Sequence, residues 1–222
     1  MNDIPVLHTH NLLIISVGFR HVCNDEQLPQ TNFRHVRVKS MRRVFAHPHL
    51  FLIGEGLVDF PNTLKVASLS AEPAPPDVSF VVAAFEVTLD DPQREAFIRR
   101  EPEYKITTTP FYAIDDEDGS EAIGEGVICL ASTDTDIDHI TKPESIETVW
   151  NWPHDSGLLP FSLYLRHCLL AVEKAGGAAH ESFLKDTYLV DRKTTLAEYL
   201  DEHGEEVMSS RPPPHLKNRF SG

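Results

Sequence analysis

Short apolar runs separated by polar turns dominate the N-terminal part of the chain. The strongest run covers residues 78–89, VSFVVAAFEVTL, in which β-branched and aromatic residues follow one another almost without a polar break. Such a run is typical of a strand that is buried on both faces in the middle of a sheet. A second run, residues 12–17, predicts another buried strand, and Gly18 after it permits a tight turn or a close approach of the backbone to a ligand.

Residues 33–45 alternate between apolar and basic side chains. Val36 and Val38 fall on one side of the predicted strand, and Arg37 and Lys39 fall on the other. We therefore expect one strand with a solvated basic face. Further strands are predicted over residues 65–69, 104–112 and 125–132.

The pattern changes to a helical period after Pro153. Helices are predicted over residues 161–175, 179–187 and 191–202, and the spacing of Thr195 and Glu198 is that of a capping box. The fold class is therefore α+β: a small mixed β-barrel or sheet with packed helices and a helical C-terminal extension. We divide the chain into an N-terminal lead-in (1–11), a β-rich core (12–150), a helical part packed on it (151–208) and a disordered tail (209–222).

Composition narrows the function classes. The chain has 222 residues and a formal net charge of −14, which argues against a nucleic-acid or anionic-membrane partner. Its three cysteines, Cys23, Cys129 and Cys168, are widely spaced and predict a reducing compartment, the cytoplasm. The N-terminal residues show no basic region followed by a long apolar stretch, so we predict no secretory signal. The apolar runs are far shorter than the about 20 residues of a membrane span. The oligomeric state is not predicted.

Two histidine pairs have the spacing of metal ligands. They are His8 with His10 and His47 with His49. No cysteine or carboxylate cluster completes a tetrahedral site around either pair, so we predict no metal.

The most informative stretch is residues 89–112. A charged helix over 92–100 runs into Glu101 and is ended by Pro102, because the residue before a proline is pushed away from the α region. Glu101 thus lies where a helix gives way to a strand. Two interpretations stay open: a carboxylate that points into a cleft, or a surface glutamate paired with Arg99 or Arg100.

The order of these segments resembles the gamma-glutamylcyclotransferase superfamily, including its ChaC-like branch. The order runs from an apolar strand with a glycine turn (14–20), through RRVF (42–45), KVASL (65–69) and VSFVVAAFEV (78–87), to a short helix and REPEY (100–104). The resemblance covers roughly residues 12–132, with a looser likeness around residues 160–165.

The resemblance implies a catalytic residue and a substrate loop. It makes Glu101 the catalytic acid and base and Tyr104 its motif partner. It also assigns substrate binding to the loop Ser16, Val17, Gly18, Phe19 and Arg20. Only the glycine of the family pattern is kept, since Val17, Phe19 and Arg20 stand where Tyr, Ser and Leu are usual.

The reaction implied is a lyase step of glutathione metabolism without a metal or cofactor. The α-amine of a γ-glutamyl compound, such as glutathione or a γ-glutamyl amino acid or amine, attacks its own γ-carbonyl carbon and releases 5-oxoproline. Phe19, Phe85 and Tyr112 are the residues expected to line a partly apolar pocket around Glu101. Because the loop is altered, the alternative is a catalytically inactive binding or regulatory module on the same fold.

Overall fold

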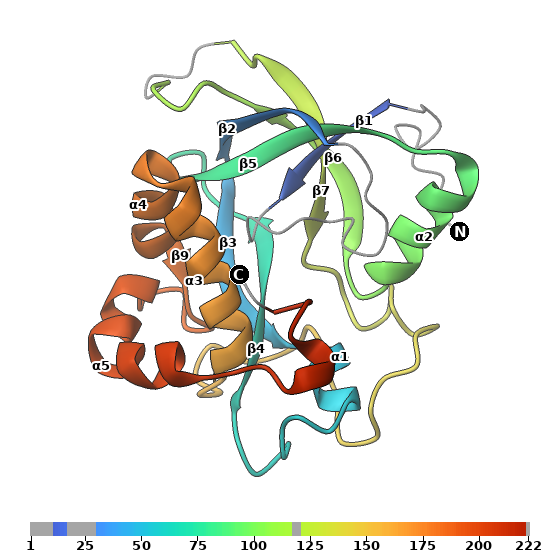
Figure 1. The fold of residues 1–222 in the computed structure, drawn as a ribbon, viewed down its shortest axis with the longest axis vertical. Helices are drawn as coiled ribbons and strands as arrows, with labels where there is room; N and C mark the ends of the chain where they lie inside the picture. The colour runs from blue at the N-terminus through green and yellow to red at the C-terminus, as the bar shows by residue number, and fades with distance from the viewer. Residues whose placement is uncertain (1–10, 17–29, 117–120, 221–222) are drawn as a thin grey trace.

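The computed structural model describes residues 11–16, 30–116 and 121–220, and these form an α+β fold (Figure 1). The strands are β1 (Asn11–Ser16), β2 (Thr31–Lys39), β3 (Met41–Pro48), β4 (Lys65–Pro73), β5 (Ser79–Thr88), β6 (Lys105–Phe111), β7 (Gly124–Leu130), β8 (Leu159–Pro160) and β9 (Thr187–Tyr188). The helices are α1 (Leu50–Gly54), α2 (Asp91–Arg100), α3 (Ser162–Ala175), α4 (Gly177–Lys185), α5 (Leu196–Ser209) and the 3₁₀ helix η2 (Pro214–Leu216).

The strands form one mixed sheet that is not closed into a barrel. The hydrogen-bonded order of the described strands is β2-β5-β1-β7-β4-β3-β9, with β6 paired to β7 and β8 paired to β4. Within the described residues, β2 meets the end of β6 at a single isolated bridge between Arg37 and Tyr112. The mixed sheet was therefore predicted correctly, and the closed barrel was not.

Strand β5 is central and is buried on both faces, as its apolar run predicts. Phe80 and Val82 pack with β2, β6 and β7 residues on one face, whereas Phe85 and Val87 pack against Phe97 of α2 on the other. Because side chains alternate along a strand, burial of both faces requires an uninterrupted apolar sequence.

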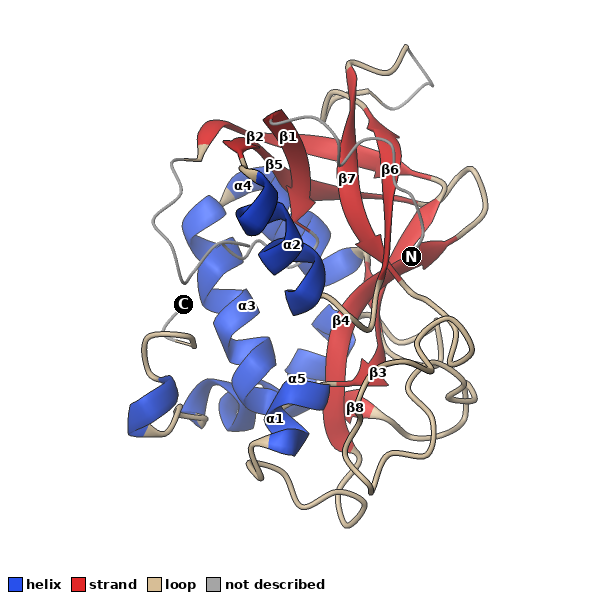
Figure 2. Ribbon diagram, turned by 90° about the vertical axis from the view of Figure 1, so that its right-hand side faces the viewer, coloured by secondary structure: helices blue, strands red, loops and turns tan. Residues whose placement is uncertain are grey.

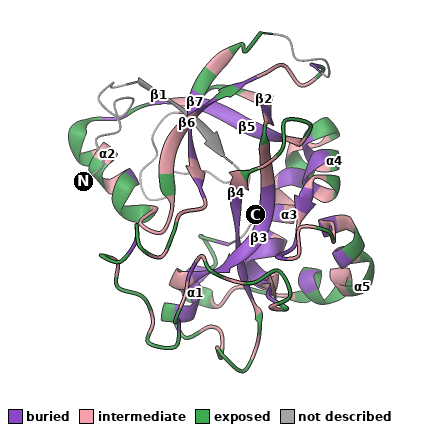
Figure 3. Ribbon diagram, turned by 180° about the vertical axis from the view of Figure 1, so that it is seen from behind, coloured by how far each residue is buried: buried purple, intermediate pink, exposed green. Residues whose placement is uncertain are grey.

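The C-terminal helices cover one side of the sheet. Figure 2 shows α3, α4 and α5 on one side of the strands, with irregular loops on the other side. The largest apolar cluster joins β3 and β4 to these helices, with Phe45, Leu165 and Phe183 all at 0% exposure. In Figure 3 the buried segments concentrate on β3, β4 and β5, while α2 and α5 carry many exposed residues.

Arg43 is buried completely between β3 and α4. Its guanidinium group lies 4.9 Å from the ring centroids of both Phe80 and Phe183. It donates hydrogen bonds to Thr187 Oγ1 (2.8 Å) and to the carbonyl oxygen of Val81 (3.0 Å). A single charged side chain thereby joins β3, β5, β9 and α4.

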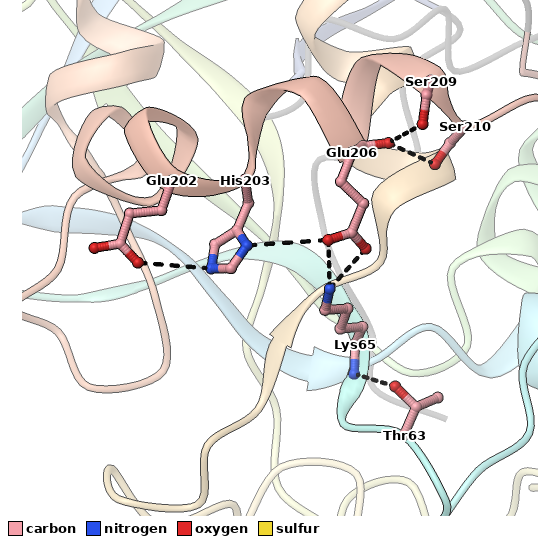
Figure 4. A network of polar contacts seen from close by, with 7 residues as sticks. All are labelled: Thr63, Lys65, Glu202, His203, Glu206, Ser209 and Ser210. Carbon is pink, nitrogen blue, oxygen red and sulfur yellow. Dashed lines mark hydrogen bonds and ion pairs between the residues drawn. The ribbon is translucent and has the colours of Figure 1, made fainter.

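A surface network ties α5 to the beginning of β4 (Figure 4). Lys65 Nζ donates to both carboxylate oxygens of Glu206 at 2.6 Å, and His203 lies 4.0 Å from the same carboxylate. Since both side chains of the Lys65–Glu206 pair are partly exposed, the ion pair adds little to the free energy of unfolding.

Two sequence predictions are corrected here. The single strand expected over residues 33–45 is two strands, β2 and β3, which are separated by a bend at Ser40, where the backbone takes a positive φ of 58°. The tail expected to be disordered from residue 209 onward is ordered as far as residue 220, where Leu216 and Phe220 are buried in the main apolar cluster. Burial of these two side chains offsets the entropy cost of ordering the segment.

Candidate functional site

Glu101 ends α2 and begins the turn that leads into β6. The helix starts with a capping box between Asp90 and Gln93 and ends at Glu101, whose φ of −115° and ψ of 44° lie outside the helical region. The backbone N–H of Glu101 donates to the carbonyl oxygen of Ile98, and that of Tyr104 donates to the carbonyl oxygen of Glu101. The predicted transition from helix to strand at this residue is therefore confirmed.

This turn lies at the end of the sheet where β1 finishes. Strand β6 is antiparallel to β7, with Ile106 opposite Cys129, so residues just before β6 lie near the C-terminal end of β7. Strand β1 runs parallel to β7, with Ile14 opposite Val127. Both strands therefore point the same way, and β1 ends at Ser16 toward the same end of β7 as the Glu101 turn.

Two carboxylates of this turn act on neighbouring groups. Burial raises the pKa of the Cys129 thiol well above its ordinary value, and the charges of Glu101 and Glu103 raise it further. Burial also raises the pKa of Tyr104 well above its ordinary value, with Glu103 and Glu101 adding to the shift. The charges of both carboxylates thus disfavour ionisation of the Tyr104 hydroxyl group and of the Cys129 thiol.

The Tyr104 hydroxyl group is held by β3 and β4. It donates to the carbonyl oxygen of Leu69 at 3.1 Å, and His47 Nε2 lies 3.0 Å from it. A hydroxyl group has one proton, and a carbonyl oxygen can only accept, so His47 must donate its Nε2 proton to Tyr104. His47 is 0% exposed, and burial lowers its pKa to about 3, so the ring is neutral at physiological pH.

Trp150 packs on the other side of His47. The two rings stack with their centroids 4.2 Å apart and an interplanar angle of 24°. The indole Nε1–H donates to the carbonyl oxygen of Glu103 at 2.9 Å. Trp150 therefore contacts both the histidine and the turn that carries the two carboxylates.

A capped loop fixes Trp150. Asp134 accepts hydrogen bonds from the backbone N–H groups of Val149 and Trp150, from the Thr148 hydroxyl group and from Asn151 Nδ2. Partial burial opposes ionisation, but these hydrogen bonds prevail and lower the pKa of Asp134. An ionised carboxylate with this many donors anchors a segment that has no helix or strand of its own.

The predicted site residues fall into three groups. Glu101 and Tyr104 lie together in the turn, and Phe85 packs with Phe97 of α2 in the cluster that Cys129 also contacts. Tyr112 lies beyond the far end of β6, about 25 Å of strand away from Tyr104, under the ammonium group of Lys39. Of the predicted loop, Ser16 is described as the last residue of β1.

The other four loop residues, Val17, Gly18, Phe19 and Arg20, lie outside the described residues. So do His8, His10 and Cys23.

Sequence reasoning missed three neighbours of Glu101. Glu103 lies two residues later and was treated only as part of a motif. The sequence patterns gave His47 only a candidate role as a metal ligand and gave Trp150 no role at this turn. No local pattern in the sequence connected His47 with a turn so distant in the chain.

No metal-binding cluster and no membrane-spanning helix occur among the described residues. No three His, Cys, Asp or Glu side chains come together there in a way that could hold an ion. No described helix is both long and apolar enough to cross a bilayer. The available polar chemistry at the turn is that of carboxylate, phenol, imidazole and thiol groups.

No known family model matches the chain, and no curated protein matches it.

Proposed function

We propose that the protein is a gamma-glutamylcyclotransferase-like lyase that uses Glu101 as its acid and base. The observation that carries the proposal is the position of Glu101, in a turn between α2 and β6 at the end of the sheet where β1 finishes. The family resemblance calls for the motif glutamate to lie at the end of the sheet where the first strand finishes, and this position of the Glu101 turn supports the proposal.

The proposed reaction needs one proton acceptor that later becomes a donor. Glu101 removes a proton from the α-ammonium group of the γ-glutamyl substrate, and the free amine attacks the γ-carbonyl carbon. The bond from that carbon to the leaving nitrogen then breaks as the Glu101 carboxyl group gives its proton to that nitrogen. The Glu101 carboxylate next takes the second proton of the attacking nitrogen, which completes the lactam, and passes it to the released amine, which leaves as an ammonium ion. The nucleophile is tethered to the carbonyl group, so proton transfer is the main demand on the protein.

The surroundings of Glu101 suit this role. The residue is partly buried, and the nearby Cys129 and Tyr104 groups stay protonated, because the pKa of each is raised. Neither is therefore a competing anion or a competing base at neutral pH. The other carboxylate at the turn, Glu103, is the alternative candidate for the base.

Release of 5-oxoproline from a panel of γ-glutamyl donors tests the proposal. We expect release by the wild type, with glutathione and several γ-glutamyl amino acids and amines as donors, and a loss of about 10²–10⁴-fold in Glu101→Gln. Glu103→Gln is the matched control, because it removes a second carboxylate from the same turn. Loss of activity in Glu103→Gln with activity retained in Glu101→Gln would reassign the base.

An absence of release from every donor would favour the alternative, a binding or regulatory module on this fold. The substrate preference of an active protein would identify the leaving group. The cytoplasm, inferred from the cysteine content, is the proposed location of either activity.

A further inference from the structure

Three aromatic or heteroaromatic side chains enclose the turn that carries Glu101. His47 comes from β3, Tyr104 from the turn itself and Trp150 from the loop capped by Asp134. The His47 and Tyr104 rings meet edge to face at 5.2 Å, as do the Tyr104 and Trp150 rings at 5.7 Å. We call these three residues the aromatic clamp.

The aromatic clamp holds the turn at two points. The Tyr104 hydroxyl group is fixed by its hydrogen bonds with His47 and with the Leu69 carbonyl oxygen. The Glu103 carbonyl oxygen is fixed by the Trp150 indole N–H. Both points lie within three residues of Glu101, so the backbone that carries its carboxylate has little freedom to shift.

His47 is the centre of the clamp. It is fully buried, its Nε2 donates to Tyr104, and one face of its ring stacks on Trp150. A β-bulge between Phe45 and His47 interrupts the pairing of β3 with β4. Bulges of this kind re-aim the side chain that follows them and are common beside active sites.

The remaining nitrogen of His47 has no structural role that would explain burying a histidine. Nδ1 is buried and has no hydrogen-bond partner among the described residues. A phenylalanine at this position would pack equally well on Trp150 and would avoid the cost of an unsatisfied polar atom. What histidine provides at this position and phenylalanine would not is the Nε2–H donor to Tyr104.

We propose that His47 is a positioning residue for Glu101, acting through Tyr104 and Trp150. This inference rests on the proposed function. Because the ring is neutral, it does not compete with Glu101 for the substrate proton. Its contribution is to keep the carboxylate at the distance and angle that proton transfer from the substrate amine requires, where a displacement of about 1 Å can cost about 10²-fold in rate.

The test compares kcat and KM for 5-oxoproline release in variants that each remove one hydrogen bond. His47→Phe keeps the stacking on Trp150 but cannot donate to Tyr104, and we expect kcat to fall about 10–100-fold with a much smaller change in KM. His47→Gln offers an amide N–H to the Tyr104 hydroxyl group and should recover most of the lost kcat. A purely structural role would lower the amount of folded protein without this split between kcat and KM.

Trp150→Phe covers the case in which the His47 variants do not fold. It keeps the stacking but loses the bond to the Glu103 carbonyl oxygen, and it should also lower kcat. Trp152→Phe is its matched control, because Trp152 Nε1 donates within the same loop, to the Thr148 carbonyl oxygen at 3.0 Å, and its ring packs against Phe60 instead of the clamp. We expect Trp152→Phe to keep wild-type kcat.

The outcomes separate the two proposals. Activity in the wild type with unchanged kcat in both His47→Phe and Trp150→Phe overturns the positioning role and leaves the lyase intact. A wild type that releases no 5-oxoproline from any donor overturns both.

Discussion

His47 Nε2 lies 3.0 Å from the Tyr104 hydroxyl oxygen, although the two residues are 57 positions apart in the chain. The hydroxyl proton goes to the Leu69 carbonyl oxygen, so the histidine has to supply the proton of the shared bond. A buried donor, a buried hydroxyl group and a strand carbonyl are thus satisfied together, and each depends on the other two.

Removal of the Tyr104 hydroxyl group should destabilise the protein. Tyr104→Phe leaves the His47 donor without an acceptor and the Leu69 carbonyl without this donor, at a cost of about 1–3 kcal/mol in the free energy of unfolding. Urea denaturation measures this change. Tyr199→Phe is the control, since the Tyr199 hydroxyl group is buried and has no hydrogen-bond partner among the described residues. Its removal should cost nothing, and equal losses in both variants would contradict the network.

Acid should destabilise the protein partly through His47. Burial lowers the pKa of His47 from its ordinary 6.5 to about 3. Between these values the unfolded chain binds a proton at this residue and the folded chain does not, so the free energy of unfolding falls as the pH falls. One such group contributes a slope of up to about 1.4 kcal/mol per pH unit.

His47→Gln should therefore flatten the dependence of unfolding free energy on pH between about 6.5 and 4. Urea denaturation at several pH values measures the slope. Asp134 adds acid sensitivity of the same sign, because its pKa is lowered in the folded state, but its contribution is common to wild type and variant. His154→Gln, at an exposed position, controls for the loss of a histidine. Parallel curves for wild type and His47→Gln would rule out this contribution.

Arg43 should contribute more to stability than its neighbour Arg42. Burial lowers the pKa of Arg43 to about 9, yet the group remains charged at neutral pH and donates to Thr187 and Val81. Arg43→Met leaves those acceptors unsatisfied, and we expect a loss of about 2–4 kcal/mol. Arg42→Met removes a partly exposed ion pair with Glu72 and should cost under about 1 kcal/mol. Thermal and urea denaturation of the two variants would show whether this order holds.

The loop that carries Trp150 should loosen when Asp134 is replaced. Asp134→Ala removes the acceptor of several hydrogen bonds, including those of the Val149 and Trp150 backbone N–H groups. We expect a loss of about 2–3 kcal/mol and a red shift of tryptophan fluorescence as Trp150 becomes more solvated. Asp138→Ala, in the same loop but exposed, should leave both quantities unchanged. A wild-type spectrum for Asp134→Ala would mean that the loop is held by its apolar side chains alone.

Local signals in the sequence predicted the elements that depend on local chemistry. The apolar run of β5 predicted its double burial, and the Glu101-Pro102 pair predicted the end of α2. Both hydrogen bonds of the predicted capping box between Thr195 and Glu198 form, although α5 begins at Leu196 and not at residue 191 as predicted. These features are decided within a few residues. Prediction failed at Ser40, because serine seldom adopts a positive φ and nothing nearby marks the bend.

The site was predictable only in part. Glu101 and Tyr104 follow from one short motif, and they do lie together. The contacts that hold them come from His47 of β3 and from Trp150 of the loop capped by Asp134. Contacts between segments so far apart in the chain depend on how the whole sheet is assembled. Arg43 illustrates the same limit, because its basic neighbours suggested a solvated strand, whereas the register of β3 turns it toward α4.

The lone bridge between Arg37 and Tyr112 has a consequence for association between molecules. Because the sheet of the described strands stops short of closure, β2 is an edge strand among them over most of its length, and edge strands can recruit a second chain by hydrogen bonding. Arg37 and Lys39 alternate along this strand with the buried Val36 and Val38. Arg34 is paired with Glu86 and Lys39 with Asp116, so this edge carries charged side chains of both signs. Charged side chains on an edge strand disfavour its pairing with another copy of the sheet.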